Sequence, residues 1–153
     1  MAQPSSTITI VIAEDNRYDQ LILRRVFKVA GLSARLRFVN NGEELLSYLG
    51  GIGGTEADGA VVPAPSIVLL DMNMPKVDGW EALREIRRNR NLQHLPVIAL
   101  STSEEPNYIA RAYALGANSY LSKPSDFSDY VTKIKILGEF WFGAAHLPPK
   151  LVH

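Results

Sequence analysis

The sequence Ile-Val-Leu-Leu-Asp-Met-Asn-Met-Pro-Lys-Val-Asp-Gly occupies residues 67–79, and the rest of the chain can be placed around it. Its first four residues are apolar, which is typical of a strand buried on both faces of a parallel sheet. Asp71 stands where the chain leaves that strand. Pro75 disfavours helix at the residue before it, so we expect a loop before a helix begins near Trp80. Open α/β sheets bind their ligands at the carboxyl ends of their strands, which is where Asp71 stands.

The composition limits the class of protein. The chain has 153 residues, 46% of them hydrophobic, which suits one domain with a true core. Lys and Arg (16) balance Asp and Glu (16), which argues against a chain built to bind nucleic acid or an anionic membrane. There is no Cys, so disulfides and thiolate metal sites are excluded, and a cytoplasmic location is expected. Residues 1–9 lack a signal-peptide pattern, and no apolar run is long enough to span a membrane.

Strand-like and helix-like segments alternate along the whole chain. Five short apolar segments are expected to form strands: residues 7–13, 34–39, 67–70, 97–100 and 119–122. Helical patterns follow them from Asp19 to Gly31, from Asn41 to Leu49, over 81–88, from Pro106 to Gly116 and over 127–142. This alternation predicts an α/β fold, a doubly wound five-stranded parallel sheet of order 2-1-3-4-5 with five helices. The second strand is the least apolar and is expected near an edge.

Two stretches receive a plain structural interpretation. Residues 50–65 are rich in Gly and Pro without periodicity, and we interpret them as a surface insertion rather than a functional lid. The helix over 81–88 and the residues just beyond it carry several arginines, which we interpret as a solvated basic face: Arg84, Arg87, Arg88 and Arg90.

The strand order brings polar side chains together at one edge of the sheet. Strands one and three are neighbours, so Glu14, Asp15 and Asp71 should lie side by side, joined by Ser101 and Lys123 from strands four and five. Three crowded carboxylates repel one another, and a hard cation with oxygen ligands, magnesium, relieves that repulsion. The cation, the lysine and the hydroxyl describe a phosphoryl pocket, in which an Asp carboxylate can be the nucleophile.

As a set, these pieces resemble the receiver domain of two-component response regulators. The matching residues are Glu14-Asp15, Asp71-Met72-Asn73-Met74-Pro75 with Asp78-Gly79, Ser101-Thr102, and Ser119-Tyr120-Leu121-Ser122-Lys123-Pro124. The resemblance covers roughly residues 7–142 and implies the flavodoxin-like receiver fold. It also implies that residues 1–153 form a single receiver domain, with a core at about 7–142 and a C-terminal extension at 143–153.

The resemblance also implies a role for each matching residue. Asp71 would accept a phosphoryl group from a phosphohistidine on a sensor histidine kinase or phosphotransfer protein, so that the chain acts as a switch and not as an enzyme. Magnesium would be held by Asp15, Asp71, the backbone carbonyl of Asn73 and, through water, Glu14. Phosphate binding and switching would fall to Ser101, Thr102, Lys123 and Tyr120. The Lys123–Pro124 bond would be cis.

The last helical pattern has two apolar residues in unusual positions. Its core face is expected to carry Phe127, Tyr130, Val131, Ile134, Leu137 and Trp141. Ile136 and Phe140 fall off that face, either as solitary exposed residues or as part of a partner surface. The segment resembles the C-terminal extension of single-domain regulators that pair with phytochrome-type kinases and form dimers, so we expect a homodimer or partner surface there.

Two other functions remain open on the sequence alone. A phosphatase of the haloacid-dehalogenase type also uses a strand-end Asp with magnesium, but it needs a second Asp where this chain has Asn73. A receiver-like module that only binds partners is the other alternative, against which the intact Asp15, Asp71 and Lys123 count. The cognate kinase, the stimulus and the downstream target are not encoded in any of these patterns.

Overall fold

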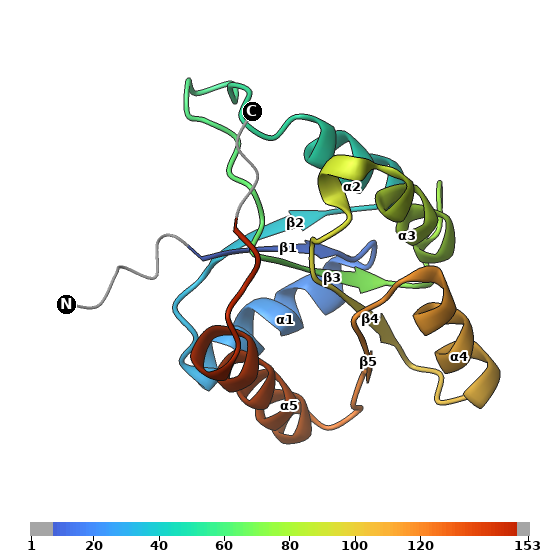
Figure 1. Cartoon of the computed structure of the whole chain (residues 1–153). Coiled ribbons are helices and arrows are strands. Elements are labelled where there is room, and N and C mark those ends of the chain that lie inside the picture. Colours follow the sequence, from blue (N-terminus) through green and yellow to red (C-terminus); the bar gives the residue numbers. More distant parts are fainter. Residues whose placement is uncertain (1–7, 150–153) are drawn as a thin grey trace.

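Five parallel strands form the central sheet of the computed structural model, which describes residues 8–149 (Figure 1). They are β1 (Thr9–Ala13), β2 (Arg35–Val39), β3 (Ile67–Asp71), β4 (Val97–Ser101) and β5 (Ser119–Ser122). Their order is β2-β1-β3-β4-β5, so the predicted topology is confirmed. Of the predicted segments, Thr7 and residues 150–153 lie outside the described residues.

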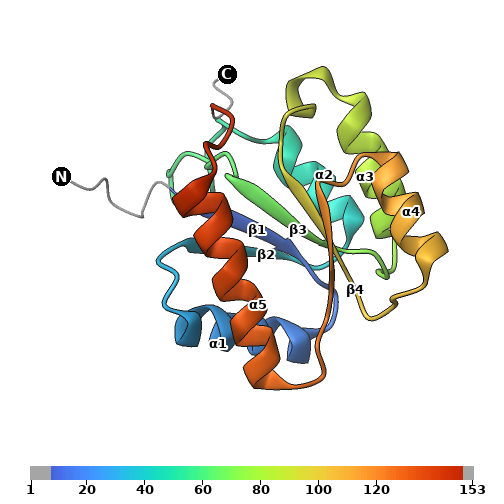
Figure 2. The ribbon, with the colours of Figure 1, turned by 60° about the horizontal axis from the view of Figure 1, so that its bottom comes forward.

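Helices cover both faces of the sheet. They are α1 (Arg17–Ala30), α2 (Gly42–Gly50), α3 (Gly79–Arg88), α4 (Pro106–Leu115) and α5 (Phe127–Glu139), with a short 3-10 turn, η2 (Arg90–Leu92), and a π-helical turn, η3 (Phe140–Ala144). Figures 1 and 2 show α1 and α5 together on one face and α2, α3 and α4 on the other. The sheet therefore separates two helical layers, as the alternating sequence predicts.

Alternate residues of the central strands enter two different cores. On β3, Ile67 and Leu69 pack into the cluster with α1 and α5, whereas Val68 and Leu70 pack into the cluster with α2, α3 and α4. Every residue of β3 is buried, while most of β2 at the edge is partly exposed. The apolar run that suggested a strand buried on both faces thus has that environment.

Short polar residues and glycines set the helix ends. Asn16, Asn41, Asp78 and Asp126 each accept a hydrogen bond from the backbone N–H three residues later, which satisfies a donor of the first turn. Because Asn16 is the cap, α1 begins at Arg17, two residues before the predicted Asp19. Glycines 31 and 116 end α1 and α4 in the left-handed conformation, as expected.

Two interpretations of single side chains were wrong. Arg87 does not lie on a solvated face: its guanidinium donates to the carbonyls of Gly116 (2.9 Å) and Leu92 (3.1 Å), and burial lowers its pKa. It therefore ties α3 to the end of α4. Phe127 is not core but 39% exposed, because it is the first residue of α5, beyond the end of β5. The others on that predicted face are buried or half-buried.

The insertion at residues 50–65 forms a small hairpin. Thr55 and Val61 make an antiparallel bridge, and Glu56 forms an ion pair with Arg37 of β2. The Tyr48 hydroxyl of α2 donates to the Pro63 carbonyl at 2.7 Å. The segment is thus fixed to the α2 side of the molecule. Among residues 8–149, none of the helices has the length and apolarity that crossing a bilayer would require.

Gly79 allows α3 to start directly against the loop that follows Asp71. A Cβ atom at Gly79 would lie 2.5 Å from the Asp71 carbonyl oxygen and closer still to the Met72 backbone. The corresponding position at Gly50, in the last turn of α2, has nothing within 4 Å. The two glycines therefore form a matched pair, one crowded by backbone and one open.

We expect Gly79→Ala to lower the free energy of unfolding by about 1–3 kcal/mol, since backbone atoms must move to admit the methyl group. Gly50→Ala, the control, should leave it unchanged or raise it by up to about 1 kcal/mol, because Ala favours helix. Urea denaturation followed by circular dichroism measures both. Equal stabilities of the two variants would contradict the tight contact at Gly79.

Candidate functional site

Three carboxylates meet where β1 and β3 end. Leu70 of β3 pairs with Ala13 of β1, which brings Asp71 beside Glu14 and Asp15. One carboxylate oxygen from each of the three residues lies within 4.8 Å of the others, a spacing that a single metal ion could bridge. Glu14 and Asp71 are buried and Asp15 is exposed. The proximity expected from strand order is present in the structure.

Lys123 contributes the positive charge of this cluster. Its Nζ donates to Glu14 Oε1 at 2.8 Å and to Asp71 Oδ2 at 2.9 Å, and its side chain is only 13% exposed. Lys123 follows β5, and its backbone N–H donates to the Ser101 carbonyl at 2.8 Å, which fixes its position relative to β4. One ammonium group faces three carboxylates, so the cluster retains negative charge that suits a divalent cation.

Backbone amides hold the second oxygen of two carboxylates. The N–H of Asn73 donates to Asp71 Oδ1 at 2.9 Å, and the N–H of Asn16 donates to Glu14 Oε2 at 3.1 Å. Asp15 makes no such bond among the described residues, so its oxygens face solvent and could ligate a metal. The side chain of Asn73 is exposed, and its predicted carbonyl ligation remains a prediction.

Burial and charge shift two pKa values in the cluster. Burial raises the pKa of Glu14 to about 7, with a further increase from the charge of Asp71, against the opposing hydrogen bond from Lys123. Burial alone would lower the pKa of Lys123, but its bonds to Glu14 and the charge of Asp71 raise it above its usual value. Lys123 is thus an ammonium at neutral pH, and Glu14 is near its titration midpoint.

The hydroxyl residues lie around the cluster without bonding to the carboxylates. Ser101 is buried at the end of β4, where its Oγ accepts a hydrogen bond from the Ser103 N–H at 3.0 Å. Thr102 is exposed and lines a groove with Lys123. Tyr120 is half-buried, and its hydroxyl donates to the Ser103 carbonyl at 2.8 Å. All peptide bonds of the described residues are trans, so the expected cis Lys123–Pro124 bond was wrong.

The loop after Asp71 contains a strained turn that the sequence did not indicate. Lys76 and Val77 both have positive φ, 44° and 45°, which is unfavourable for a β-branched residue. The Val77 carbonyl accepts a hydrogen bond from the Gly42 N–H at 3.1 Å, and a side chain at Gly42 would collide with that oxygen. The start of α2 thereby supports the strained turn.

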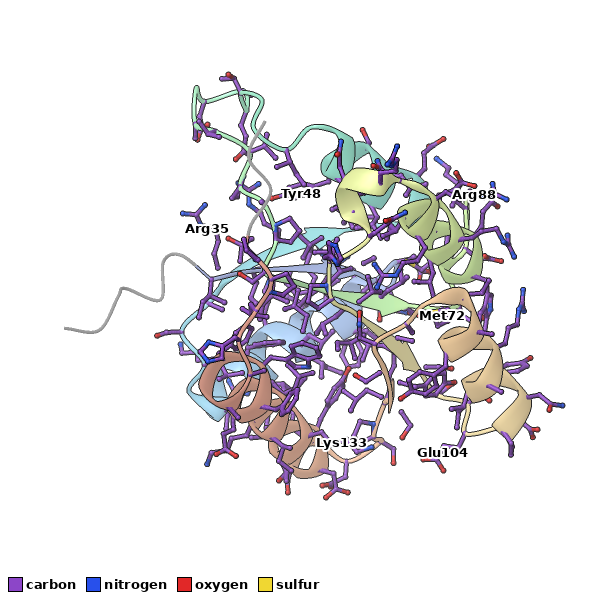
Figure 3. The ribbon with its side chains drawn as sticks, in the orientation of Figure 1. Arg35, Tyr48, Met72, Arg88, Glu104 and Lys133 are labelled. Carbon is purple, nitrogen blue, oxygen red and sulfur yellow. The ribbon has the colours of Figure 1, made fainter. Side chains whose placement is uncertain are left out.

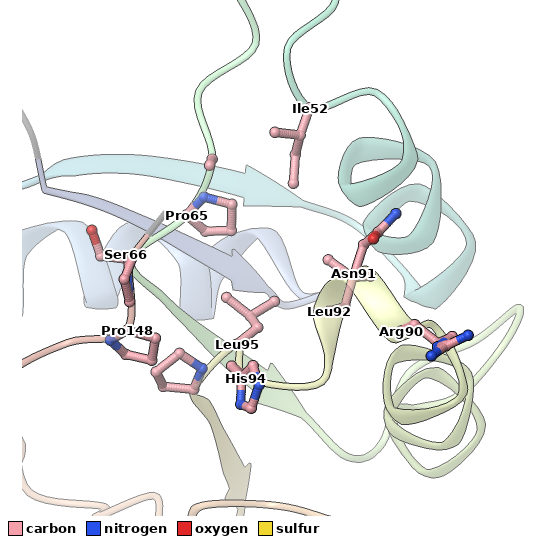
Figure 4. Close-up of a pocket in the computed structure, with 12 residues that line it drawn as sticks. Ile52, Pro65, Ser66, Arg90, Asn91, Leu92, His94, Leu95 and Pro148 are labelled. Carbon is pink, nitrogen blue, oxygen red and sulfur yellow. The ribbon is translucent and has the colours of Figure 1, made fainter. Parts of the chain in front are cut away.

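A separate cavity lies at the other end of the strands, where β3 and β4 begin. It has a volume of about 450 Å³ and is lined by residues that precede β3 and β4, among them Pro65, Ser66 and Leu95, together with Pro148 of the C-terminal extension (Figure 4). The length of β3, roughly 15 Å at strand geometry, separates it from Asp71. This cavity is therefore no part of the carboxylate cluster.

Comparisons with known proteins agree with this geometry. Residues 10–135 match the family described as Response regulator receiver domain. Rcp1, a response regulator from Synechocystis sp., is 31% identical over 91% of this chain and 92% of its own length. The Mn²⁺-bound structure of Rcp1 superposes with a TM-score of 0.78 over 93% of this chain and 99% of that one, at 30% identity.

Two further structures are similar over the same span. RPA3017 of R. palustris, a response regulator in red light signaling, has a TM-score of 0.84 and is 46% identical. RcpA, a cyanobacterial phytochrome response regulator solved in its phosphorylated form, has a TM-score of 0.81 and is 32% identical. Each comparison covers 93% of this chain and 99% of the other.

The raised pKa of Glu14 predicts how stability depends on pH when metal is removed. In the folded protein the Glu14 carboxyl keeps its proton up to about pH 7, whereas in the unfolded chain it loses the proton near its ordinary pKa of 4.5. The contribution of Glu14 to the free energy of unfolding is therefore fully present below about pH 4.5. It decreases by about 3 kcal/mol in total as the pH rises to 7. Urea denaturation in EDTA, repeated at several pH values between 5 and 8, measures this decrease in the free energy of unfolding.

The matched variants isolate the contribution of Glu14. In Glu14→Gln this fall in stability should disappear, while Glu43→Gln, at an exposed residue, should retain the wild-type dependence. Parallel curves for wild-type protein and Glu14→Gln would show that Glu14 titrates at its ordinary pKa.

Proposed function

Because this chain belongs to the response regulator receiver domain family, we propose that Asp71 is the residue that accepts its phosphoryl group. Receiver domains are phosphoacceptor switches of two-component signalling rather than metabolic enzymes, and they take phosphoryl groups from histidine kinases or phosphotransfer proteins. One observation carries the assignment: Asp71 ends the central strand β3, lies in the carboxylate cluster and accepts a hydrogen bond from Lys123.

The side chains around Asp71 suit transfer from a phosphohistidine. An Asp71 carboxylate oxygen would attack phosphorus, forming the P–O bond as the P–N bond breaks. The electron pair of the P–N bond would leave with the histidine ring, which becomes neutral imidazole with one ring proton taken from solvent. Lys123 stays cationic 2.9 Å from Asp71 Oδ2, where it can stabilise the phosphoryl oxygens. The Asn73 N–H keeps the other oxygen oriented.

Receiver domains bind Mg²⁺ or Mn²⁺ at an acidic pocket, and we propose Mg²⁺ here. Asp15, Asp71 and the Asn73 carbonyl would hold it, with Glu14 acting through water, and the ion would neutralise charge on the transferred group. All these ligands are oxygens, which is the preference of magnesium. Nothing favours the phosphatase alternative, since the position two residues after Asp71 holds an amide.

A groove between α1 and α5 reaches Lys123, the residue that is bonded to Asp71. It has a volume of about 630 Å³ and is lined by Tyr18, Ile22, Phe127 and Lys123. Tyr18 is 70% exposed, and Leu21, three residues further along α1, is 56% exposed; exposed apolar side chains of this kind suit a protein partner. We assign the groove to a phytochrome-type kinase in the cytoplasm, in keeping with the named roles of RPA3017 and RcpA.

The end of α5 supports a homodimer. Ile136 and Phe140 are 58% and 53% exposed and are one helical turn apart. They border an apolar hollow of about 230 Å³ whose lining includes Leu121 and Trp141. We propose that a second copy covers this surface, and that residues 1–153 form one receiver domain with its core at 7–142 and an extension at 143–153.

Asp71→Asn should abolish the adduct, since the amide is not a nucleophile for phosphorus. Wild-type protein incubated with acetyl phosphate and Mg²⁺ should gain the mass of one phosphoryl group, labile in base, and so should the control Asp129→Asn at an exposed carboxylate. Intact-protein mass spectrometry measures the adduct. An adduct that persists in Asp71→Asn would place the nucleophile elsewhere.

Ile136→Asp should weaken self-association at least about tenfold, because a charge at the interface centre loses its hydration. Val29→Asp places the same charge on an exposed apolar residue of α1 and should leave the dissociation constant unchanged. Sedimentation velocity with and without acetyl phosphate measures both. A monomeric wild-type protein under both conditions would refute the dimer.

A further inference from the structure

Side chains of β5 hold the loop between β4 and α4. The Tyr120 hydroxyl donates to the Ser103 carbonyl at 2.8 Å, and the Ser122 hydroxyl donates to Glu104 Oε2 at 2.9 Å. Within the loop, the Ser103 N–H donates to Ser101 Oγ at 3.0 Å. A displacement of Ser101 would therefore move Ser103 and Glu104 relative to β5.

Ser122 connects this loop to α5. Lys133 Nζ donates to Ser122 Oγ at 3.0 Å and to the Ser122 carbonyl at 3.1 Å. Lys133 can only donate and the hydroxyl has a single proton, so the direction of the two bonds is fixed from Lys133 through Ser122 to Glu104. Both ends are charged, which makes each bond stronger than a neutral one. Figure 3 shows Lys133 and Glu104 near the end of β5.

Lys133 also belongs to the apolar hollow at the end of α5. The hollow is lined by Lys133 together with Ile136, Phe140 and Trp141. The ammonium group is drawn toward Ser122, while the aliphatic part of the side chain forms a wall of the hollow. A change in the partner of the ammonium therefore alters the surface that we assign to the second copy.

We propose that Glu104, Ser122 and Lys133 form a relay that transmits the state of Asp71 to the hollow on α5. The inference rests on the proposed function, because it assumes a phosphoryl group on Asp71. Movement of Ser101 toward that group would carry Glu104 away from Ser122, and Lys133 would lose the charged end of its hydrogen-bond chain. The relay thus stabilises the arrangement in which Ser101 Oγ lies with the Ser103 amide, and breaking any link favours the switched arrangement.

The two tryptophans of the chain report separately on the two ends of this relay. Trp80 follows Gly79 at the start of α3, where its ring contacts Tyr108 of α4 at 5.9 Å between centroids. Trp141 lines the hollow. Their indole N–H signals in ¹⁵N-edited NMR spectra, assigned with Trp80→Phe, distinguish a change near Asp71 from a change at α5.

The experiment compares these signals in EDTA and with Mg²⁺ and beryllofluoride, a phosphoryl analogue. In wild-type protein both signals should move. In Ser122→Ala and Glu104→Gln the Trp141 signal in EDTA should already lie part of the way to the switched position, corresponding to roughly a threefold larger switched population. Glu105→Gln and Lys135→Gln, exposed neighbours on the same loop and helix, should coincide with wild-type protein.

Each result decides between the two proposals. If the phosphoryl adduct forms and the Trp141 signal does not move, or if both relay variants match wild-type protein, the relay is refuted and the function of Asp71 stands. If neither signal moves and no phosphoryl adduct forms, the proposed function fails and the relay fails with it. Thermal unfolding verifies that the variants fold. If Ser122→Ala does not fold, Glu104→Gln, at an exposed residue, still tests the relay.

Discussion

The ammonium group of Lys123, bonded to both Glu14 and Asp71, is the contact on which the site depends. It reaches across the sheet from the end of β5 to the ends of β1 and β3, and without it buried carboxylates would face one another unpaired. The same pairing leaves Asp15 exposed and the cluster short of positive charge. This excess of negative charge favours the binding of a divalent cation at the cluster.

Much of this arrangement follows from the sequence because it depends on strand order. Once strands one and three are neighbours, residues 14, 15 and 71 must lie at a common edge, whatever rotamers they adopt. The helix caps are equally local, since Asn16 or Asp78 acts within its own turn. Fold and cluster were therefore predictable, whereas the cis bond expected at Lys123–Pro124 came only from the resemblance and was wrong.

Side-chain contacts over long sequence separations were beyond prediction. Arg87 looks like its arginine neighbours in the sequence, and its bond to the Gly116 carbonyl at the end of α4 joins it to a residue 29 positions away. Ser122 and Lys133 are common surface residue types, and nothing in their spacing indicates a shared hydrogen bond. The strained turn at Val77 was equally hidden, because its support comes from Gly42 on another helix. Such pairs depend on packing that periodicity does not describe.

The hairpin at residues 51–62 is joined to the body by Arg37 and Tyr48, on the side where the chain returns to the amino end of β3. Its tip therefore projects away from Asp71 (Figure 1). Length changes at this tip lie outside both cores and across the sheet from the carboxylates. The protein thus has a place where a second module or a fluorescent reporter could be grafted, and signalling could be followed without disturbing the switch itself.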